Sequence, residues 1–438
     1  QSMTLDLNGH KITAEFTNTE GFDLIKNYGE LTITDTSEGQ NGSIEVTENG
    51  SAEKSRTSVI YNGYDTGEFT LEAGTLKLTG GANSKKTLYG VYSSGTTVVM
   101  NGGAIEVRRL NSYYEYSESW DVYGIYNSSG CQTTVNGGTI TVENQGMYNS
   151  AYGIFNASGT VSIHGTPETP YIAANAFNTG IYFEHTLYGN ITLYGGKYNM
   201  QTDTATGWIE GENNITIAEG YEKKFNGNRT VSIVKSPVAQ IGSTKYDTLE
   251  EAVAAVKSGE TITMLTDVEE GSGIIVPSGS NFTIDFAGHT YKVVGNLAGS
   301  TGTESQCFQL LRDSNITMKN GTIVANNSGI QMIIQNYANL TLDGMTLDAT
   351  QGTNNVGYVM SNNCGNVTIT GNTNITAKDG EVAFDVFYWP DNGYVEGVTV
   401  TVDENMTGTI TGKIEYAADD TAQDADVAEK AKLNIEAG

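Results

Sequence analysis

Apolar and polar residues alternate in short runs along most of the chain. At residues 5–7, 76–78 and 105–107, two apolar side chains flank a charged one. A period of two is typical of a β-strand, because successive side chains point to opposite faces of a sheet. The pattern therefore predicts many short strands, each with one face toward a core and the other toward water.

A unit of three strands and two turns recurs along the chain. Its first strand carries Tyr-Gly-Ile-Tyr or a close variant, with glycines 34, 29 and 27 residues apart, at residues 89–92, 123–126, 152–155 and 179–182. In the later half, a shorter apolar-Thr-apolar motif has threonines 24 and 27 residues apart, at residues 316–318, 340–342 and 367–369. Such internal periods are the signature of repeat architectures.

Two architectures fit short alternating strands: an antiparallel sandwich and a parallel β-helix. A sandwich gives no reason to repeat three strands with matching turns. A solenoid requires that repetition, because one coil cannot bury its apolar face alone. The sequence therefore predicts an all-β protein with the fold of a right-handed parallel β-helix.

The segment 247–257 is the one good helix pattern in the sequence. Thr248 and Glu251 form a capping box, Gly259 is a stop signal, and one apolar stripe consists of Leu249, Ala252, Val253 and Val256. A lone amphipathic helix before strands suits the end of a solenoid, which otherwise exposes its core and strand edges. We expect it to cap a second β-helix.

The chain therefore divides near residue 236 into two tandem β-helix domains, 1–235 and 236–438. Residues 3–10 and 282–289 match position for position, so the first domain is a copy that lacks its capping helix. Residues 433–438 match 69–74, where the repeat continues. We expect that the chain belongs to a longer protein and was cut at both ends.

Composition narrows the possible functions. The 438 residues include 53 Gly but 5 Pro, which excludes collagen, and a 38% hydrophobic content argues against disorder. The formal net charge of −28 opposes nucleic acids and anionic membranes, and no apolar run approaches the ~20 residues of a membrane span. The cysteines, Cys131, Cys307 and Cys364, have no metal-binding spacing and are interpreted as small apolar residues.

Residues 241–252, 259–265 and 284–289 resemble a module of large surface proteins from anaerobic gut bacteria, often described as adhesin-like, with pectate-lyase-like β-helix repeats. The resemblance covers the second domain and most of the first. It implies a secreted or cell-surface bacterial protein whose anchor lies outside this chain.

An enzyme is the first alternative, because polysaccharide lyases and glycosidases also use β-helices. A lyase on polyuronates needs cations near its substrate, but the chain has five arginines and a strong negative charge. A glycosidase needs two facing carboxylates, for which Asp313, Asp343 and Asp348 are possible sources. His10 and His289, which match in the two copies, are interpreted as turn residues. We assign no catalytic residue, cofactor or metal ion.

Two aromatic clusters are the best functional lead. The longest repeat contains Tyr113, Tyr114, Tyr116 and Trp120, and a second cluster contains Tyr388, Trp389 and Tyr394. Exposed rings beside Asn, Asp and Glu suit stacking on sugar faces or a protein hot spot. The alternative is that these rings pack over the flank of the coils. The regularly placed Tyr89, Tyr92, Tyr123 and Tyr126 are interpreted as rings that stack between repeats.

Asn-x-Ser/Thr tripeptides occur at Asn190, Asn281, Asn315, Asn339 and Asn366. They could be glycosylation acceptors, but asparagines stacked in turns before threonine strands explain the same strings. We favour stacked asparagine ladders.

The sequence therefore predicts a non-catalytic extracellular adhesin or glycan-binding scaffold, monomeric, with a host or dietary glycan or a host protein surface as partner. It predicts neither nucleic-acid binding nor membrane insertion. A polysaccharide-degrading glycoside hydrolase or lyase and a passive structural spacer remain alternatives.

Overall fold

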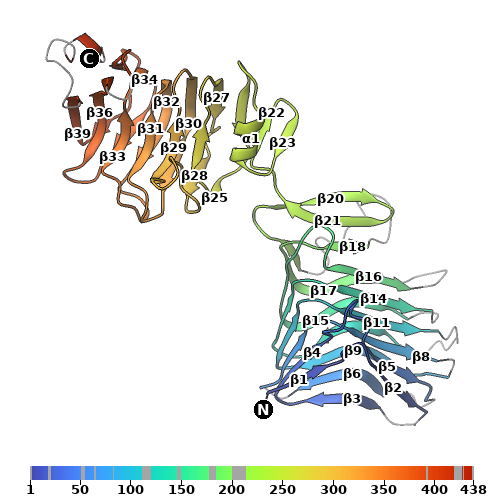
Figure 1. The fold of residues 1–438 in the computed structure, drawn as a ribbon. Helices are drawn as coiled ribbons and strands as arrows, with labels where there is room; N and C mark the ends of the chain where they lie inside the picture. The colour runs from blue at the N-terminus through green and yellow to red at the C-terminus, as the bar shows by residue number, and fades with distance from the viewer. Residues whose placement is uncertain are drawn as a thin grey trace. The chain divides into compact units, whose positions relative to one another are not determined.

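The protein is a parallel β-solenoid of about 12 turns in a computed structural model (Figure 1). It forms two compact units, Gln1–Ser236 and Pro237–Gly438. The predicted all-β fold of stacked parallel coils is confirmed. The structure describes residues 2–17, 21–50, 55–63, 66–81, 83–110, 120–145, 149–176, 184–199, 214–390, 393–418, 427 and 429–436.

Each coil of the first unit adds one strand to each of three faces. The first face contains β1 (Ser2–Asp6), β4 (Glu30–Thr34), β7 (Glu68–Leu71), β10 (Thr97–Met100), β13 (Cys131–Val135), the later parts of β15 (Ala151–Ile163) and β17 (Glu184–Leu193), and β19 (Ile215–Ile217). The second contains β2 (Lys11–Phe16), β5 (Ser43–Glu48), β8 (Thr75–Gly80), β11 (Ala104–Arg109), β14 (Thr139–Asn144), β16 (Tyr171–Ala176) and β18 (Lys197–Asn199). The third contains β3 (Phe22–Asn27), β6 (Arg56–Gly63), β9 (Thr87–Ser94), β12 (Val122–Asn127) and the earlier parts of β15 and β17. An antiparallel hairpin, which the sequence analysis did not predict, pairs with β18 through β21 and consists of β20 (Tyr221–Gly227) and β21 (Thr230–Lys235).

The second unit repeats the three-faced arrangement. Its first face contains β24 (Thr261–Met264), β27 (Asn281–Asp285), the earlier parts of β30 (Asn315–Ala325) and β32 (Asn339–Asp348), β34 (Gly365–Thr370), β37 (Val398–Val402) and β40 (Ala431–Ile435). The second contains β25 (Val268–Gly271), β28 (Thr290–Val293), the later parts of β30 and β32, β35 (Asn374–Thr376) and β38 (Ile410–Thr411). The third contains β26 (Ile274–Val276), β29 (Gln306–Leu310), β31 (Met332–Asn336), β33 (Tyr358–Asn362), β36 (Val382–Tyr388) and β39 (Lys413–Ala418).

A short cap precedes the coils of the second unit. It consists of the antiparallel pair β22 (Ala239–Ile241) and β23 (Thr244–Tyr246), followed by α1 (Leu249–Ala255). The predicted helix is present but ends two residues earlier and begins two residues later, because Thr248 and Val256 have extended backbones. The Thr248 hydroxyl accepts a hydrogen bond from the Glu251 N–H at 3.1 Å, as a capping box requires.

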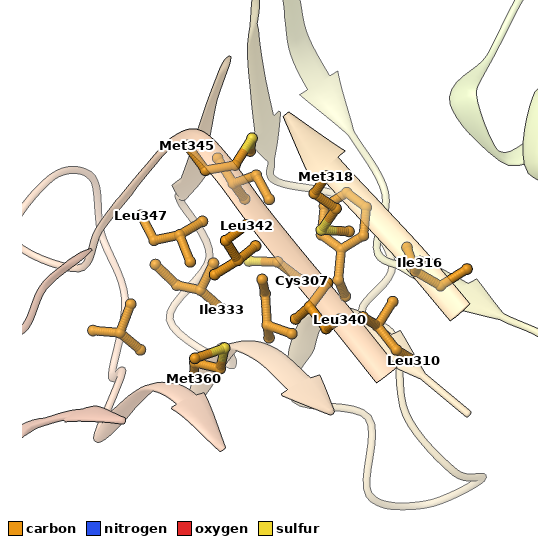
Figure 2. Packing of buried hydrophobic residues seen from close by; sticks show 14 of the residues in the cluster. Cys307, Leu310, Ile316, Met318, Ile333, Leu340, Leu342, Met345, Leu347 and Met360 are labelled. Atoms are coloured by element: carbon orange, nitrogen blue, oxygen red, sulfur yellow. The ribbon is translucent and has the colours of Figure 1, made fainter. Parts of the chain in front are cut away.

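The repeated motifs of the second unit pair in register. Ile316, Leu340 and Val367 are consecutive partners on neighbouring coils, and their side chains are buried. Figure 2 shows Leu340 and Leu342 of β32 in the core beside Ile316 and Met318 of β30. The three cysteines are buried and free, in agreement with their interpretation as apolar residues.

The two predicted domain openings form the same turn. Asn8 and Gly9 have φ values of 43° and 75°, and Ala287 and Gly288 have φ values of 51° and 89°. The N–H of the histidine that follows donates to the carbonyl three residues earlier in both, at 2.7 Å for His10 and 2.8 Å for His289. Both histidines are therefore turn residues, as predicted.

The fourth predicted copy of the tyrosine motif, residues 179–182, is wrong. The strand that pairs with the third copy places His185 opposite Tyr152, Leu187 opposite Ile154 and Tyr188 opposite Phe155. Leu187 keeps the buried apolar position, and the buried Thr186 stands where the other copies have a glycine. Residues 179–182 lie outside the described part of the chain.

Candidate functional site

The first predicted aromatic cluster is only partly visible in the structure. Tyr113, Tyr114 and Tyr116 lie outside the described residues. Trp120 is 3% exposed, and its ring lies 5.9 Å from the guanidinium of Arg109 and 5.7 Å from the Lys85 amine. Trp120 is therefore not an exposed binding ring; it is buried in the structure, in agreement with the alternative that these rings pack over the flank of the coils.

Buried charged side chains lie next to the covered ring of Trp120. The Arg109 side chain is fully buried and donates to the Ser84 carbonyl at 2.7 Å and to that of Lys86. Lys86 pairs with the buried Glu48 at 3.2 Å. Burial lowers the pKa of Arg109 to about 10, so the guanidinium is charged at neutral pH. Uncompensated buried charges are costly, and here the charges are paired or hydrogen-bonded. Because Arg109, Lys86 and Glu48 are fully buried, the network presents none of these groups to a ligand.

The second aromatic cluster divides between core and surface. Tyr388 is 5% exposed and belongs to the core, so it does not offer the ring face that was expected. Trp389 and Tyr394 are half-buried. Tyr394 stacks on Tyr337 with ring centroids 5.0 Å apart, and Trp389 lies 6.0 Å from Tyr394.

Tyr337 lines a cavity of about 270 Å³ at the corner between the third and first faces. Arg312, Asp313 and Glu396 line the same cavity. The Arg312 guanidinium lies 5.7 Å from the Tyr394 ring centroid. Burial raises the pKa of Tyr337 to about 12, so its hydroxyl keeps its proton at neutral pH. The cavity therefore offers one cation, two carboxylates and an aromatic wall.

A groove of about 430 Å³ lies on the first face beside this cavity. We call it the ladder groove, because an asparagine and a threonine two positions later line it on each of β27, β30, β32 and β34. The asparagines are Asn281, Asn315, Asn339 and Asn366, and the threonines are Thr283, Thr317, Thr341 and Thr368.

Register and hydrogen bonds fix these two columns. Thr283, Thr317, Thr341 and Thr368 are consecutive partners, because their strands pair in parallel without a shift. The Asn339 amide donates to Asn315 Oδ1 at 2.9 Å and accepts from the Asn366 N–H at 2.9 Å. The predicted asparagine ladder is therefore present, and it lies at the surface.

The groove and the cavity share Asn339 and Asn366, so they adjoin along the asparagine column. Among the described residues that line the groove, Glu260 is the one with a charged side chain. Amides and hydroxyls both donate and accept hydrogen bonds, which suits a neutral ligand rich in hydroxyl groups.

The structure does not bring together the three carboxylates considered for a glycosidase. Asp313 lines the cavity. Asp343 pairs in register with Lys319 on β30, and Asp348 accepts hydrogen bonds from Thr350 and Gln351 in the turn after β32. These aspartates therefore supply no facing pair in the ladder groove.

A different carboxylate pair escaped the sequence analysis. Asp385 of β36 and Glu415 of β39 are partners on neighbouring coils of the third face. Asp385 accepts from the Ser361 hydroxyl at 3.2 Å, and Glu415 accepts from the Tyr358 hydroxyl at 2.6 Å. Burial, reinforced by the negative charge of Glu415, raises the pKa of Asp385 to about 7. Only the register of β36 and β39 shows that these two carboxylates are neighbours. Their separation of 30 residues differs from the 24 and 27 residues of the sequence repeat, so the repeat did not align them.

The tyrosines of the first unit form two stacked columns on its third face. One column has successive centroid distances of 5.8, 5.2, 5.1 and 4.5 Å and contains Tyr61, Tyr92, Tyr126, Phe155 and Tyr188. The other has distances of 4.9 and 4.8 Å and contains Tyr89, Tyr123 and Tyr152. The prediction that these rings stack between repeats is confirmed. Because the rings cover one another's faces, the columns present ring edges rather than platforms for sugars.

The fold and the groove define the class of the protein as a parallel β-solenoid with a polar surface groove. No family model matches the chain, and searches of curated proteins and of solved structures give no match. No helix in the described part of the chain is long and apolar enough to cross a membrane. The described residues contain no group of three or more His, Cys, Asp or Glu side chains placed to hold a metal ion.

Proposed function

We propose that the chain is a non-catalytic glycan-binding module of a secreted or surface-attached bacterial protein, and that the ladder groove is its binding site. The observation that carries the proposal is the groove itself, in which stacked asparagines and threonines face solvent beside a cavity with an aromatic wall. The proposed location rests on the adhesin-like motifs in the sequence.

The chemistry of the groove favours a sugar over a protein surface. Protein hot spots are centred on desolvated aromatic or arginine anchors. The groove instead carries asparagine and threonine side chains between buried apolar ones, with Glu260 at one end. The half-buried ring of Tyr394 stacks on Tyr337, which lines the cavity, and the half-buried ring of Trp389 lies beside Tyr394. They add an apolar border of the kind that stacks on sugar faces.

A glycan microarray with the full chain tests this proposal. Binding to a neutral glycan is expected, and Thr341→Glu should abolish it by placing a carboxylate in the groove. Thr346→Glu is the matched control, because Thr346 is a similarly half-buried threonine of the same strand, after the bend, and does not line the groove. A blank array, which a passive spacer predicts, or equal loss in both variants would overturn the proposal.

Hydrolysis of a polysaccharide is a second candidate function, favoured by the Asp385–Glu415 pair. A carboxyl group that holds its proton near neutral pH beside a carboxylate provides the acid and base that glycosidases use. Release of reducing ends from a polysaccharide, lost in both Asp385→Asn and Glu415→Gln, would support it. Absence of released ends with every polysaccharide that the chain binds would reject it.

A further inference from the structure

We infer that the ligand of the ladder groove is a neutral, extended polysaccharide that lies along the solenoid axis, with one sugar opposite each coil. This inference rests on the proposed function and adds the class, direction and length of the ligand. Three observations support it: the spacing of the strands under the groove, the charged side chains around the groove, and the two ends of the asparagine column.

The spacing of the groove is that of its strands. Neighbouring β-strands lie about 4.8 Å apart, so the same pair of polar side chains recurs at that interval from β27 to β34. An extended chain of pyranose rings advances by about one ring length per sugar, which is close to the strand spacing. Each sugar of such a chain would lie opposite one rung. Neighbouring β-1,4-linked sugars are turned over relative to each other, and the amides and hydroxyls of each rung, which both donate and accept, can bind either edge. A coiled polysaccharide turns its sugars away from one line and would not place one sugar opposite each rung.

The Asn339 amide, in the middle of the groove, is held in place before a ligand arrives. The hydrogen bond from the Asn339 amide to Asn315 occupies one of its two N–H groups, and the Asn366 N–H fixes its oxygen. The second amide N–H and the Thr341 hydroxyl stay available on the same rung. Because the amide orientation is already fixed, binding costs less side-chain entropy.

The charges around the groove select against acidic sugars. Glu260 lines one end of the groove, and Asp313 and Glu396 line the adjoining cavity. Arg312 is the cation of that cavity and lies 3.8 Å from the Asp313 carboxylate. A polyuronate would place a negative charge opposite each coil of a chain with net charge −28.

The asparagine column has two defined ends. On the coil before β27, Gly259 lies beside Asn281 and donates its N–H to the Asn281 carbonyl at 2.7 Å. On the coil after β34, Thr399 is the register partner of Asn366. Four rungs therefore carry both an asparagine and a threonine, and we expect the site to hold four sugars.

Calorimetric titration of the full chain with β-1,4-linked gluco- and manno-oligosaccharides of two to eight sugars tests the inference. One hydrogen bond of about 1 kcal/mol corresponds to about fivefold in affinity, so a gain of about two- to fivefold per sugar is expected up to four sugars and little beyond. Asn281→Ala removes the end rung and should move the plateau from four sugars to three, whereas the surface control Asn372→Ala in the turn before β35 should leave it at four.

Two comparison ligands sharpen the test. α-1,4-linked gluco-oligosaccharides, which coil, and oligouronates of equal length should both bind at least tenfold more weakly. Affinity that is independent of length, or equal affinity for the coiled or acidic series, would overturn the inference while leaving glycan binding intact. Failure of both neutral series to bind would also overturn it. If the glycan microarray is blank as well, the proposed function falls with it.

Discussion

Tyr394 lies face to face with Tyr337, at a centroid distance of 5.0 Å and an interplanar angle of 25°. The two residues follow β36 and β31 respectively, so the contact joins turns from coils that are not adjacent in sequence. Tyr337 in turn lines the cavity beside the ladder groove. The turn that carries Trp389 and Tyr394, which we call the aromatic turn, therefore contacts the cavity beside the groove through Tyr337, a ring outside that turn.

Tyr394→Ala should weaken glycan binding without unfolding the second unit. The substitution removes the ring that covers Tyr337 and the aromatic surface next to Arg312. A stacking contact of about 1 kcal/mol corresponds to about fivefold weaker binding. Titration with the microarray hit measures the effect, and Tyr394→Phe should retain the affinity of the parent. Unchanged affinity in Tyr394→Ala would remove the aromatic turn from the site.

Asp385→Asn should stabilise the protein at alkaline pH. Because the pKa of Asp385 is raised to about 7 in the folded state, the folded protein holds a proton that the unfolded chain releases near pH 4. Its stability therefore falls as the pH rises from about 4 to about 7, by up to about 4 kcal/mol, and the amide variant escapes this loss. The Asn side chain can still accept the hydrogen bond from the Asn362 N–H.

Urea unfolding of parent and variant at pH 4 and pH 8 measures this difference. The two proteins should be similarly stable at pH 4, and the variant should be more stable at pH 8. Glu415→Gln removes only the neighbouring charge and should give a smaller gain. A variant that is less stable than the parent at pH 8 would show that Asp385 is ionised and paired.

Gly124→Ala should destabilise the first unit. A Cβ at this position would lie 2.4 Å from a methyl group of Ile140 and 2.5 Å from the Gly153 carbonyl oxygen, so the neighbouring coil must move. Overpacking of this kind costs about 1–3 kcal/mol. Gly357→Ala is the control, because its Cβ would have its nearest contact at 3.7 Å. Thermal unfolding should show a lower midpoint for the first variant alone, and equal midpoints would contradict the tight packing of the coils.

Thr248→Ala should loosen the cap of the second unit. The threonine hydroxyl satisfies the Glu251 N–H at the start of α1, and loss of such a cap costs about 1 kcal/mol. Thr248→Ser keeps the hydroxyl and should behave as the parent. Hydrogen exchange at the amides of α1 measures the effect, since faster exchange is expected only in the alanine variant.

Much of the fold could be predicted because its causes are local. Alternation gives the strands, and the repeat gives their stacking, so Ile316 and Leu340 could be aligned from the sequence alone. The same reasoning failed at residues 179–182, where a tyrosine motif resembles the repeat although His185 to Tyr188 form the paired strand. The resemblance of the motif did not show which residue occupies the buried position next to Ile154. In the structure that residue is Leu187.

The candidate site was harder to predict, because it arises between coils. Asn339 was correctly interpreted as part of a ladder. The groove could not be predicted from one Asn-x-Thr tripeptide, because four strands on neighbouring coils form it. For Trp120 the sequence left open an exposed ring or a ring packed over the coils, because nothing in it places the buried Arg109 beside Trp120. Asp385 and Glu415 meet only once the register of β36 and β39 is known.

A crystal structure of the chain with the microarray hit bound tests the central claim most directly. The account predicts density for an extended sugar chain over Asn281, Asn315, Asn339 and Asn366, parallel to the solenoid axis, with the aromatic turn at its side. Sugar density elsewhere, such as on the tyrosine columns of the first unit, with the ladder groove empty, would contradict it.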